Sequence, residues 1–384
     1  MPDAFELQMH PAMRFGPGAA DATGRAVSDL TGAAVPVLLV ADPVLESFGV
    51  TARVRASLER DGHAVSTFSD LASDPKESAV DVACAQLESV GAAAVVGLGG
   101  GSAMDTAKLV AAIAGHGRPA ADYALSATPY AYRRTALVCV PTTAGTGAET
   151  TPTSIVSRDA DGVKNWFWGP ALKPDTAILD PELTRALPPF WTFFTGFDAL
   201  VHAMESRTNR YSYPANDAIA EEAIELAIGH LARATTDGDD MEARGAMLLA
   251  AAKAGLAISN TGCAAGHNVG HALGSMAGVP HGRAVAIAFV ATLPWTMQAN
   301  RAAFDRVGVL LGGEGAEDIA PILSELARGC GQSLSLTPDE RASIDAARLA
   351  DDLTAPANVS MLDACARDRS DGTGRELVSL TLAA

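Results

Sequence analysis

The chain is poor in cysteine, in aromatic residues and in long apolar runs. Aromatic residues make up 5% of its 384 residues, and there are five cysteines. The cysteines are odd in number and widely separated, so their spacing builds neither a disulfide framework nor a CxxC metal site. They are Cys84, Cys139, Cys263, Cys330 and Cys365. This pattern predicts a reduced, cytoplasmic protein.

Long apolar segments are also missing. A membrane-spanning helix needs roughly 18 uninterrupted apolar residues, and the nearest candidate, residues 284–295, is too short. The first fifteen residues lack the charged-then-apolar layout of a secretory signal. We therefore expect no association with a membrane and no secretion signal.

Positive charge is scarce. The 28 lysines and arginines are outnumbered by 45 aspartates and glutamates, which gives a formal net charge of −17 without a dense basic patch. Phosphate backbones would be repelled by such a surface, so the composition argues against a nucleic-acid partner. With 48% hydrophobic and 19% charged residues, the chain is instead typical of a globular protein long enough for two domains.

Apolar runs alternate with helical patterns in the first half of the chain. The run at residues 35–41 is continuously apolar, as in a strand that is buried on both faces of a parallel sheet. The pattern predicts strands at 35–41, 64–68, 93–98, 135–140, 153–157 and 176–179, with helices at 43–61, 74–89 and 103–114. This alternation predicts a Rossmann-like α/β domain, which we place at residues 1–188.

The second half is alanine-rich and poor in strand patterns. The pattern there predicts long helices, such as those at 216–234 and 241–258. The double proline Pro188-Pro189 can continue neither a helix nor a strand, so we place a domain boundary there. Residues 189–384 are expected to form an all-α domain.

Two polar loops follow predicted strands of the first domain. Residues 97–102 read GLGGGS, where backbone amides and a helix N-terminus can approach a phosphate. An ordinary tight turn explains this loop equally well, because the G-x-G-x-x-G fingerprint is not complete. Residues 141–151 form a second loop, rich in threonine and glycine, for which a solvated loop is the alternative. The two loops together favour a nucleotide site at the carboxyl ends of the strands.

Asp42 ends the first predicted strand. A carboxylate there can accept hydrogen bonds from an adenosine ribose and would repel a 2′-phosphate, which favours NAD over NADP. Capping the helix that follows Pro43 is the alternative role.

Four histidines and one aspartate suggest a metal site in the second domain. Asp198 and His202 are four residues apart, as are His267 and His271, so each pair shares a helical face. His281 follows a Gly-Val-Pro break, which lets the chain turn back. One carboxylate and three imidazoles suit Fe(II), Zn(II) or a similar ion. Spacing does not distinguish the three ligands from a fourth histidine that serves as proton relay, and a buried hydrogen bond is the alternative for Asp198–His202.

Five ordered motifs resemble the iron-containing (group III) alcohol dehydrogenases. They are GGGSAMDTAK (99–108), PTTAGTGAETTPTSIVS (141–157), KPDTAILDPELTRALPP (173–189), TGFDALVHAMES (195–206) and GHNVGHALGSMAGVPHG (266–282). The resemblance covers nearly the whole chain and is weak only beyond about residue 331. It implies a dinucleotide-binding α/β domain, a helical metal-binding domain and a metal between them.

The resemblance also implies roles for single residues. Asp198, His202, His267 and His281 match the positions of the iron ligands, and His271 matches a histidine near the substrate that is a candidate for proton relay. The cofactor positions that it implies are Asp42, Gly100, Gly101, Ser102, Thr142, Thr143, Thr151, Lys164 and Leu183. One departure is the aromatic run Asn165–Trp168, for which we favour packing over an aromatic wall beside the nicotinamide.

The activity that the resemblance implies is an NAD(P)-dependent alcohol dehydrogenase or aldehyde reductase that requires Fe²⁺, with Zn²⁺ or another divalent ion as the alternative. Hydride would pass between the nicotinamide and a small alcohol or aldehyde. A zinc-dependent polyol dehydrogenase of the glycerol type and a dehydroquinate synthase-like lyase are the competing functions. Relatives of this kind commonly assemble as homodimers or larger oligomers.

Overall fold

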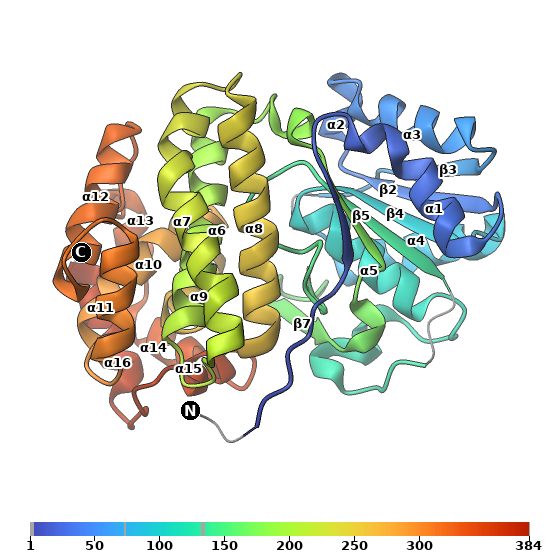
Figure 1. The fold of residues 1–384 in the computed structure, drawn as a ribbon. Helices are drawn as coiled ribbons and strands as arrows, with labels where there is room; N and C mark the ends of the chain where they lie inside the picture. Colours follow the sequence, from blue (N-terminus) through green and yellow to red (C-terminus); the bar gives the residue numbers. More distant parts are fainter. Residues whose placement is uncertain (1–3, 73, 132–134, 384) are drawn as a thin grey trace. The chain divides into compact units, whose positions relative to one another are not determined.

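The computed structural model describes residues 4–72, 74–131 and 135–383. Two compact units make up the chain (Figure 1). The sheet unit comprises residues 9–186, and the helical unit comprises residues 4–8 and 187–383. The domain boundary placed at Pro188-Pro189 stays a prediction.

The sheet unit alternates strands and helices. Its strands are β1 (Ala12–Phe15), β2 (Pro36–Ala41), β3 (Ala64–Phe68), β4 (Ala94–Gly99), β5 (Ala136–Pro141), β6 (Thr153–Ser157), β7 (Lys164–Trp168) and β8 (Thr176–Leu179). Its helices are η1 (Ala19–Ala22), α1 (Thr23–Thr31), α2 (Val44–Ser47), α3 (Val50–Arg60), α4 (Glu77–Val90), α5 (Gly101–Ile113), η2 (Ala120–Ser126), η3 (Pro170–Leu172) and η4 (Pro181–Thr184).

The described strands form a six-stranded sheet in the order β1-β8-β5-β4-β2-β3, in which all neighbours run parallel. Strand β2 pairs with β3 on one side and with β4 on the other. The direction in which the chain crosses the sheet therefore reverses between β2 and β4. In open parallel sheets, ligands bind at the carboxyl ends of the strands beside such a reversal.

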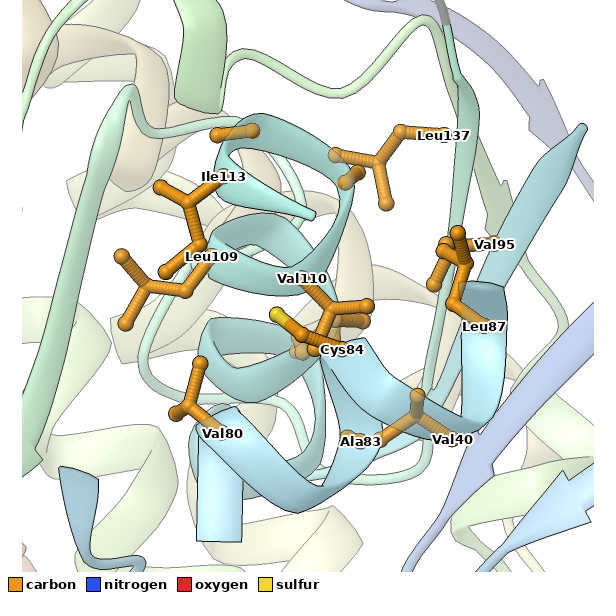
Figure 2. Packing of buried hydrophobic residues seen from close by; sticks show 14 of the residues in the cluster. Val40, Val80, Ala83, Cys84, Leu87, Val95, Leu109, Val110, Ile113 and Leu137 are labelled. Atoms are coloured by element: carbon orange, nitrogen blue, oxygen red, sulfur yellow. The ribbon is translucent and has the colours of Figure 1, made fainter. Parts of the chain in front are cut away.

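Alternate residues of the central strands pack on opposite faces of the sheet. Leu38 and Val40 join the buried side chains of α4 and α5 on one face, which Figure 2 shows from close by. Val37 and Leu39 join those of α1 and α3 on the other face. Burial on both faces explains why the sequence of β2 is continuously apolar.

The structure departs from the predicted elements at several places. The helix expected over 43–61 is divided into α2 and α3, because Gly49 adopts a left-handed φ of 71°. Helix α4 begins at Glu77 rather than at residue 74, since Lys76 forms a bridge with Ser157. The strand expected at 153–157 is present as β6, but it pairs antiparallel with β7 outside the main sheet. Strand β1 was not predicted.

The aromatic run after Lys164 forms strand β7, which the sequence pattern did not predict. Successive side chains of a strand point to opposite faces. Phe167 accordingly lies fully buried in the same hydrophobic cluster as Leu38 and Val40, whereas Trp168 is 48% exposed. Asn165 is buried as well, and its amide donates to Glu77 Oε1 at 2.6 Å. Phe167 and Asn165 therefore pack inside the sheet unit.

The helical unit carries no strand within its described residues. Its helices are α6 (Pro189–Thr208), α7 (Pro214–Thr236), α8 (Met241–Thr261), α9 (Ala265–Ala277), α10 (His281–Thr296), α11 (Arg301–Leu310), η5 (Ala316–Asp318), α12 (Ile319–Gly329), α13 (Pro338–Ala342), α14 (Ala346–Thr354), α15 (Val359–Ala364) and α16 (Thr373–Ala383). Within the described residues, none of the helices combines the length and the apolar character that a membrane crossing requires.

Helix α6 lies at the centre of this unit. It packs against α7, α8 and α10, and α9 packs against α10. Proline occupies the first position of α6, where its missing N–H costs no helical hydrogen bond. The parallel sheet with its helices and the helical second part confirm the fold class predicted from the sequence.

Replacing Phe167 tests its packing role. Phe167→Ala should lower the free energy of unfolding by about 3–5 kcal/mol, because a large buried ring leaves a cavity. Trp168→Ala, on the exposed face of the same strand, should change it by less than about 1 kcal/mol. Chemical denaturation of both variants measures the difference, and equally small losses would contradict the packing interpretation.

Candidate functional site

Three helices of the helical unit bring four histidines and one carboxylate together. Asp198 and His202 lie on α6, His267 and His271 on α9, and His281 is the first residue of α10. The Nε2 atoms of His267 and His281 lie 3.4 and 3.5 Å from Asp198 Oδ1. The rings of His202 and His267 stack with their centroids 4.2 Å apart, and those of His271 and His281 are 5.0 Å apart.

Local sequence explains how these helix ends approach one another. A Cβ atom on Gly282 would lie 2.2 Å from the carbonyl oxygen of Phe194. Only glycine therefore allows the first turn of α10 to close against α6. This contact places His281, the residue before Gly282, beside Asp198 one helical turn after Phe194.

The cluster is buried, and two of the atoms that face each other in it lack hydrogen bonds of normal geometry within the described part of the chain. Asp198, His202, His267 and His271 are between 1% and 6% exposed. Among the described residues, neither Asp198 Oδ1 nor His267 Nε2 has a hydrogen-bond partner of normal geometry, although the two atoms are 3.4 Å apart. Buried polar atoms are rarely left in this state in proteins. A cation between them would satisfy both, so the donor set fits a metal ion.

The electrostatics of the cluster also favour a cation. Burial alone would raise the pKa of the Asp198 carboxyl, but the imidazoles of His202, His281 and His267 hold that pKa well below its usual range. Burial opposes the charged form of His267, but the carboxylates of Glu205 and Asp198 raise the pKa of its imidazole to about 9. The two carboxylates thus create a negative potential where His267 Nε2 lies.

Two sets of donor atoms lie close enough to share one ion. Asp198, His267 and His281 form one set, and His202, Cys263 and His267 form the other, with donor atoms within 4.8 Å of one another in each set. Neither set includes His271, which stands beside the cluster. Nitrogen and carboxylate donors suit Fe(II) and Zn(II).

Two residues at this site were not found from the sequence. Cys263 precedes α9 and lies four residues before His267, the same spacing as Asp198 and His202, so this spacing was a usable signal. Burial, with the Glu205 and Asp198 carboxylates, raises its pKa well above the usual value. Glu205 lies seven residues after Asp198 and three after His202 on α6. That spacing puts it on the ligand face of the helix and was a usable signal.

In the sheet unit, the carboxyl ends of three neighbouring strands carry most of the predicted cofactor residues. Asp42 follows β2, the stretch Gly100–Ser102 follows β4, and Thr142 and Thr143 follow β5. The Asp42 amide donates to Leu98 O at 3.1 Å, and the Thr142 amide donates to Gly99 O at 3.0 Å. The structure thus brings these residues together at the reversal between β2 and β4.

Gly99 makes this close approach feasible. Its φ is 148°, and a Cβ atom there would lie 2.8 Å from Ala103 Cβ and 3.1 Å from Asp42 Cβ. The N-terminus of α5 follows two residues later, with its free amides at the same edge. Asp42 Oδ1 accepts from the Val44 amide at 3.0 Å, so a local turn uses one of its oxygens.

A buried lysine anchors the threonine loop. Lys108 on α5 is fully buried, and its ammonium donates to Asp105 Oδ1 at 3.0 Å, to Ala148 O at 3.0 Å, to Thr151 Oγ1 at 3.1 Å and to Thr153 O. Thr151 therefore accepts a hydrogen bond from the protein itself. One ammonium thus joins two residues of the loop, Ala148 and Thr151, and the first residue of β6, Thr153, to α5.

The remaining predicted cofactor residues lie elsewhere in the sheet unit. Lys164 begins β7, and its ammonium is 3.9 Å from Asp74 Oδ1. Leu183 lies on η4, which follows β8, so it belongs to the same edge of the sheet as the loops. Its side chain is 5% exposed and packs in the core beneath that edge.

Two family models match the chain. The model described as iron-containing alcohol dehydrogenase matches residues 11–181, and the model of the Fe-containing alcohol dehydrogenase family, C-terminal, matches residues 192–380.

Individual relatives agree with the family match. A choline dehydrogenase of Bacillus subtilis is 34% identical over 80% of this chain and 76% of its own. The probable alcohol dehydrogenase EutG of Salmonella typhimurium is 33% identical over 95% of this chain and 89% of its own. The crystal structure of sulfoacetaldehyde reductase from Bifidobacterium kashiwanohense in complex with NAD+ superposes with a TM-score of 0.88, 25% identity and 99% coverage of both chains. These matches favour an alcohol dehydrogenase over the polyol dehydrogenase and lyase alternatives.

The threonine-rich loop at residues 141–151 contains a buried carboxyl group, Glu149, which predicts that the stability of the chain depends on pH. Glu149 is 1% exposed, and burial raises its pKa to about 7. The unfolded chain has a pKa of about 4.3 at this group and therefore releases the proton more readily. Glu149 should therefore lower the unfolding free energy by an amount that grows as the pH rises from about 4 to 7. Above about pH 7 this amount should stay constant.

Glu149→Gln removes this titration. Relative to the unsubstituted chain, the variant should gain about 2 kcal/mol in unfolding free energy between pH 5 and pH 8. Denaturant titrations at the two pH values measure this gain. Glu59→Gln, on the exposed side of α3, should show no such pH dependence, and an equal difference at both pH values for Glu149→Gln would refute the argument.

Proposed function

Because the chain belongs to the iron-containing alcohol dehydrogenase family, we propose that it interconverts a small alcohol and its aldehyde with NAD and a divalent metal ion, Fe²⁺ being the preferred ion. Asp198, His202, His267 and His281 are the proposed ligands. The observation that carries this proposal is the pair of buried atoms Asp198 Oδ1 and His267 Nε2, 3.4 Å apart and without normal hydrogen bonds.

When bound, the metal supplies Lewis acidity at the substrate oxygen, and the nicotinamide supplies or accepts the hydride. The polypeptide provides the binding geometry for both. Asp198 balances the charge of the ion with its carboxylate, and the imidazoles of His202, His267 and His281 donate lone pairs. These four side chains would supply one oxygen and three nitrogen donors, and an ion that accepts more than four ligands could also take the substrate oxygen.

His271 is the proposed proton carrier. It stands beside the ligand cluster, 5.0 Å from His281 between ring centroids, and belongs to neither set of ligand atoms. An imidazole titrates near neutral pH, so it can pass a proton between the substrate oxygen and solvent.

The loops of the sheet unit are the proposed cofactor site. Amides of Gly100, Gly101 and Ser102 at the N-terminus of α5 would bind the pyrophosphate. Thr142 and Thr143 follow β5 at the same edge, and we propose that their hydroxyls contact the cofactor. Thr151 joins the loop to Lys108, and Leu183 packs in the core beneath the edge. Asp42 is proposed to bind the adenosine ribose and Lys164 the nicotinamide ribose.

The substrate and the assembly are the broadest parts of the proposal. The relatives named above are described for choline, an alcohol and sulfoacetaldehyde, which share a small skeleton with a terminal oxygen but differ in charge. A small alcohol or aldehyde is the class that they have in common. Homo-oligomeric assembly is proposed as well, and the edge strand β1 exposes Met13 and Phe15.

A substrate panel tests the activity. The purified chain, loaded anaerobically with Fe(II) or with Zn(II), should oxidise NADH with small aldehydes and reduce NAD with the corresponding alcohols, as followed by NADH absorbance. Chelator treatment should abolish both directions, and added metal should restore them. A metal-loaded chain that leaves NADH unchanged with every member of the panel would overturn the proposed function.

Removing a ligand tests the metal centre. His267→Ala should lose the bound ion and about a thousand-fold or more in kcat/KM, because several kcal/mol of transition-state stabilisation depend on the metal. Elemental analysis and steady-state kinetics measure the two effects. His230→Ala is the control, since His230 lies on α7 and bonds to Leu226 O. Normal metal content and rate in His267→Ala would refute the ligand assignment.

Cofactor preference tests the role of Asp42. Asp42→Asn keeps an oxygen that can accept from the Val44 amide but removes the charge. Hydrogen bonds to charged groups are worth about 1.5–3 kcal/mol, so the ratio of kcat/KM for NAD over NADP should fall by about 10–100-fold. If Asp42 serves only the local turn, the ratio will not change, and thermal denaturation will show whether the turn is intact.

A further inference from the structure

Glu205 makes an unusual number of contacts with the segment that carries His267. It lies on α6 and is 2% exposed. Its Oε2 accepts from the Ala264 amide at 2.7 Å and pairs with His267 Nδ1 at 2.7 Å. Its Oε1 accepts from the Gly266 amide at 2.6 Å and from the His267 amide at 3.3 Å. Both oxygens are therefore used by a single short segment at the start of α9.

The bond to His267 fixes how the imidazole is protonated. An ionised carboxylate is only an acceptor, so the hydrogen between the two groups must reside on Nδ1. When the imidazole is neutral, as a metal ligand must be, the other ring nitrogen, Nε2, is then left with its lone pair, and it faces Asp198 Oδ1 at 3.4 Å. The hydrogen bond to Glu205 thus places the ring hydrogen on Nδ1 of His267. Nε2, which faces Asp198, then has the lone pair that a metal requires.

Gly266, at the start of α9, leaves room for the carboxylate of Glu205 because it has no side chain. A Cβ atom on Gly266 would lie 2.9 Å from Glu205 Oε1 and 3.0 Å from Phe289 Cβ. Any other residue at this position would push either the carboxylate or α10 away. The glycine before His267 is therefore needed for the short bond between Glu205 and the ring.

We propose that Glu205 is a positioning residue of the metal centre, which orients His267 and holds its Nε2 free for the ion. The inference rests on the metal site proposed above. Carboxylates that accept from the second nitrogen of a ligand histidine raise its basicity as a ligand, and their loss typically weakens metal binding 10–100-fold.

Capping the first turn of α9 is the competing role. The amides of Ala264, Gly266 and His267 occupy the same two oxygens, and negative charge at a helix N-terminus is stabilising. A residue that acts only as a cap would affect the stability of the chain but not the affinity of the folded site for metal. The two roles therefore predict different measurements.

The substitution Glu205→Gln distinguishes the positioning role from the capping role. Both oxygens of Glu205 face nitrogen atoms, so the NH₂ group of glutamine replaces an acceptor at one of them. If the new NH₂ group takes the place of Oε2, it faces His267 Nδ1, and the ring can accept only by moving its hydrogen to Nε2, which blocks the ligand lone pair. If it takes the place of Oε1, it opposes two backbone N–H groups and displaces the segment that carries His267. Either arrangement should weaken the site.

The experiment compares three full-length chains: the unsubstituted chain, Glu205→Gln and Glu221→Gln. The control residue Glu221 lies on α7 in the same helical unit and binds Arg207 and Arg306 rather than a histidine. Zn(II) and Co(II) affinities are measured by competition with a chromophoric chelator, and the stability of each metal-free chain by thermal denaturation. Glu205→Gln should bind both ions 10–100-fold more weakly, whereas Glu221→Gln should bind them as the unsubstituted chain does.

Distinct results would overturn the inference. A Glu205→Gln chain that is less stable but binds metal with unchanged affinity would show that Glu205 is only a helix cap. An unsubstituted chain that binds neither ion would remove the proposed metal site and this inference with it. Should Glu205→Gln not fold, a crystal structure of the unsubstituted chain with Zn(II) decides: Nε2 of His267 on the ion and Nδ1 on Glu205 are expected, and Nδ1 on the ion would refute the role.

Discussion

The arrangement of α6, α9 and α10 depends on one buried carboxylate. Removing an ionised Asp198 from water carries a penalty of several kcal/mol unless opposite charge surrounds it. The imidazoles that face it come from all three helices, so the compensation requires those helices to meet at this point. The cluster of Asp198 and the histidines therefore also connects the three helices, so metal binding at the proposed site would be coupled to helix packing.

A comparable constraint governs the sheet unit. Polar loops gather at one edge because parallel strands all end there, and the reversal between β2 and β4 lies at this edge. Buried polar groups hold the edge in place: the ammonium of Lys108 ties the loop after β5 to α5 through Thr151 and the backbone. These hydrogen bonds restrict the loop before any ligand binds, and preorganisation of this kind reduces the conformational entropy that binding must overcome.

Much of the fold followed from patterns that depend on neighbours in the sequence. Strands β2, β4 and β5 are buried on both faces, so each reads as a continuous apolar run and was predicted. Strand β1 is short and half exposed at the edge of the sheet, and β7 carries a lysine and an exposed tryptophan, so neither resembles a buried strand. The break at Gly49 was missed because a glycine in a helical pattern does not reveal its φ.

The sequence by itself determined which residue types are present and their helical phase: Asp198 with His202, and His267 with His271, share faces because four residues make about one turn. Its ordered motifs also indicated the family. Only the tertiary structure decided which faces meet. Glu205 binds His267 across 62 residues of sequence because α6 packs beside the start of α9. Cys263, in the segment between α8 and α9, lies near His202 of α6 for the same reason. No local periodicity encodes such contacts, because they arise from side-chain shapes such as the missing Cβ of Gly266 and Gly282.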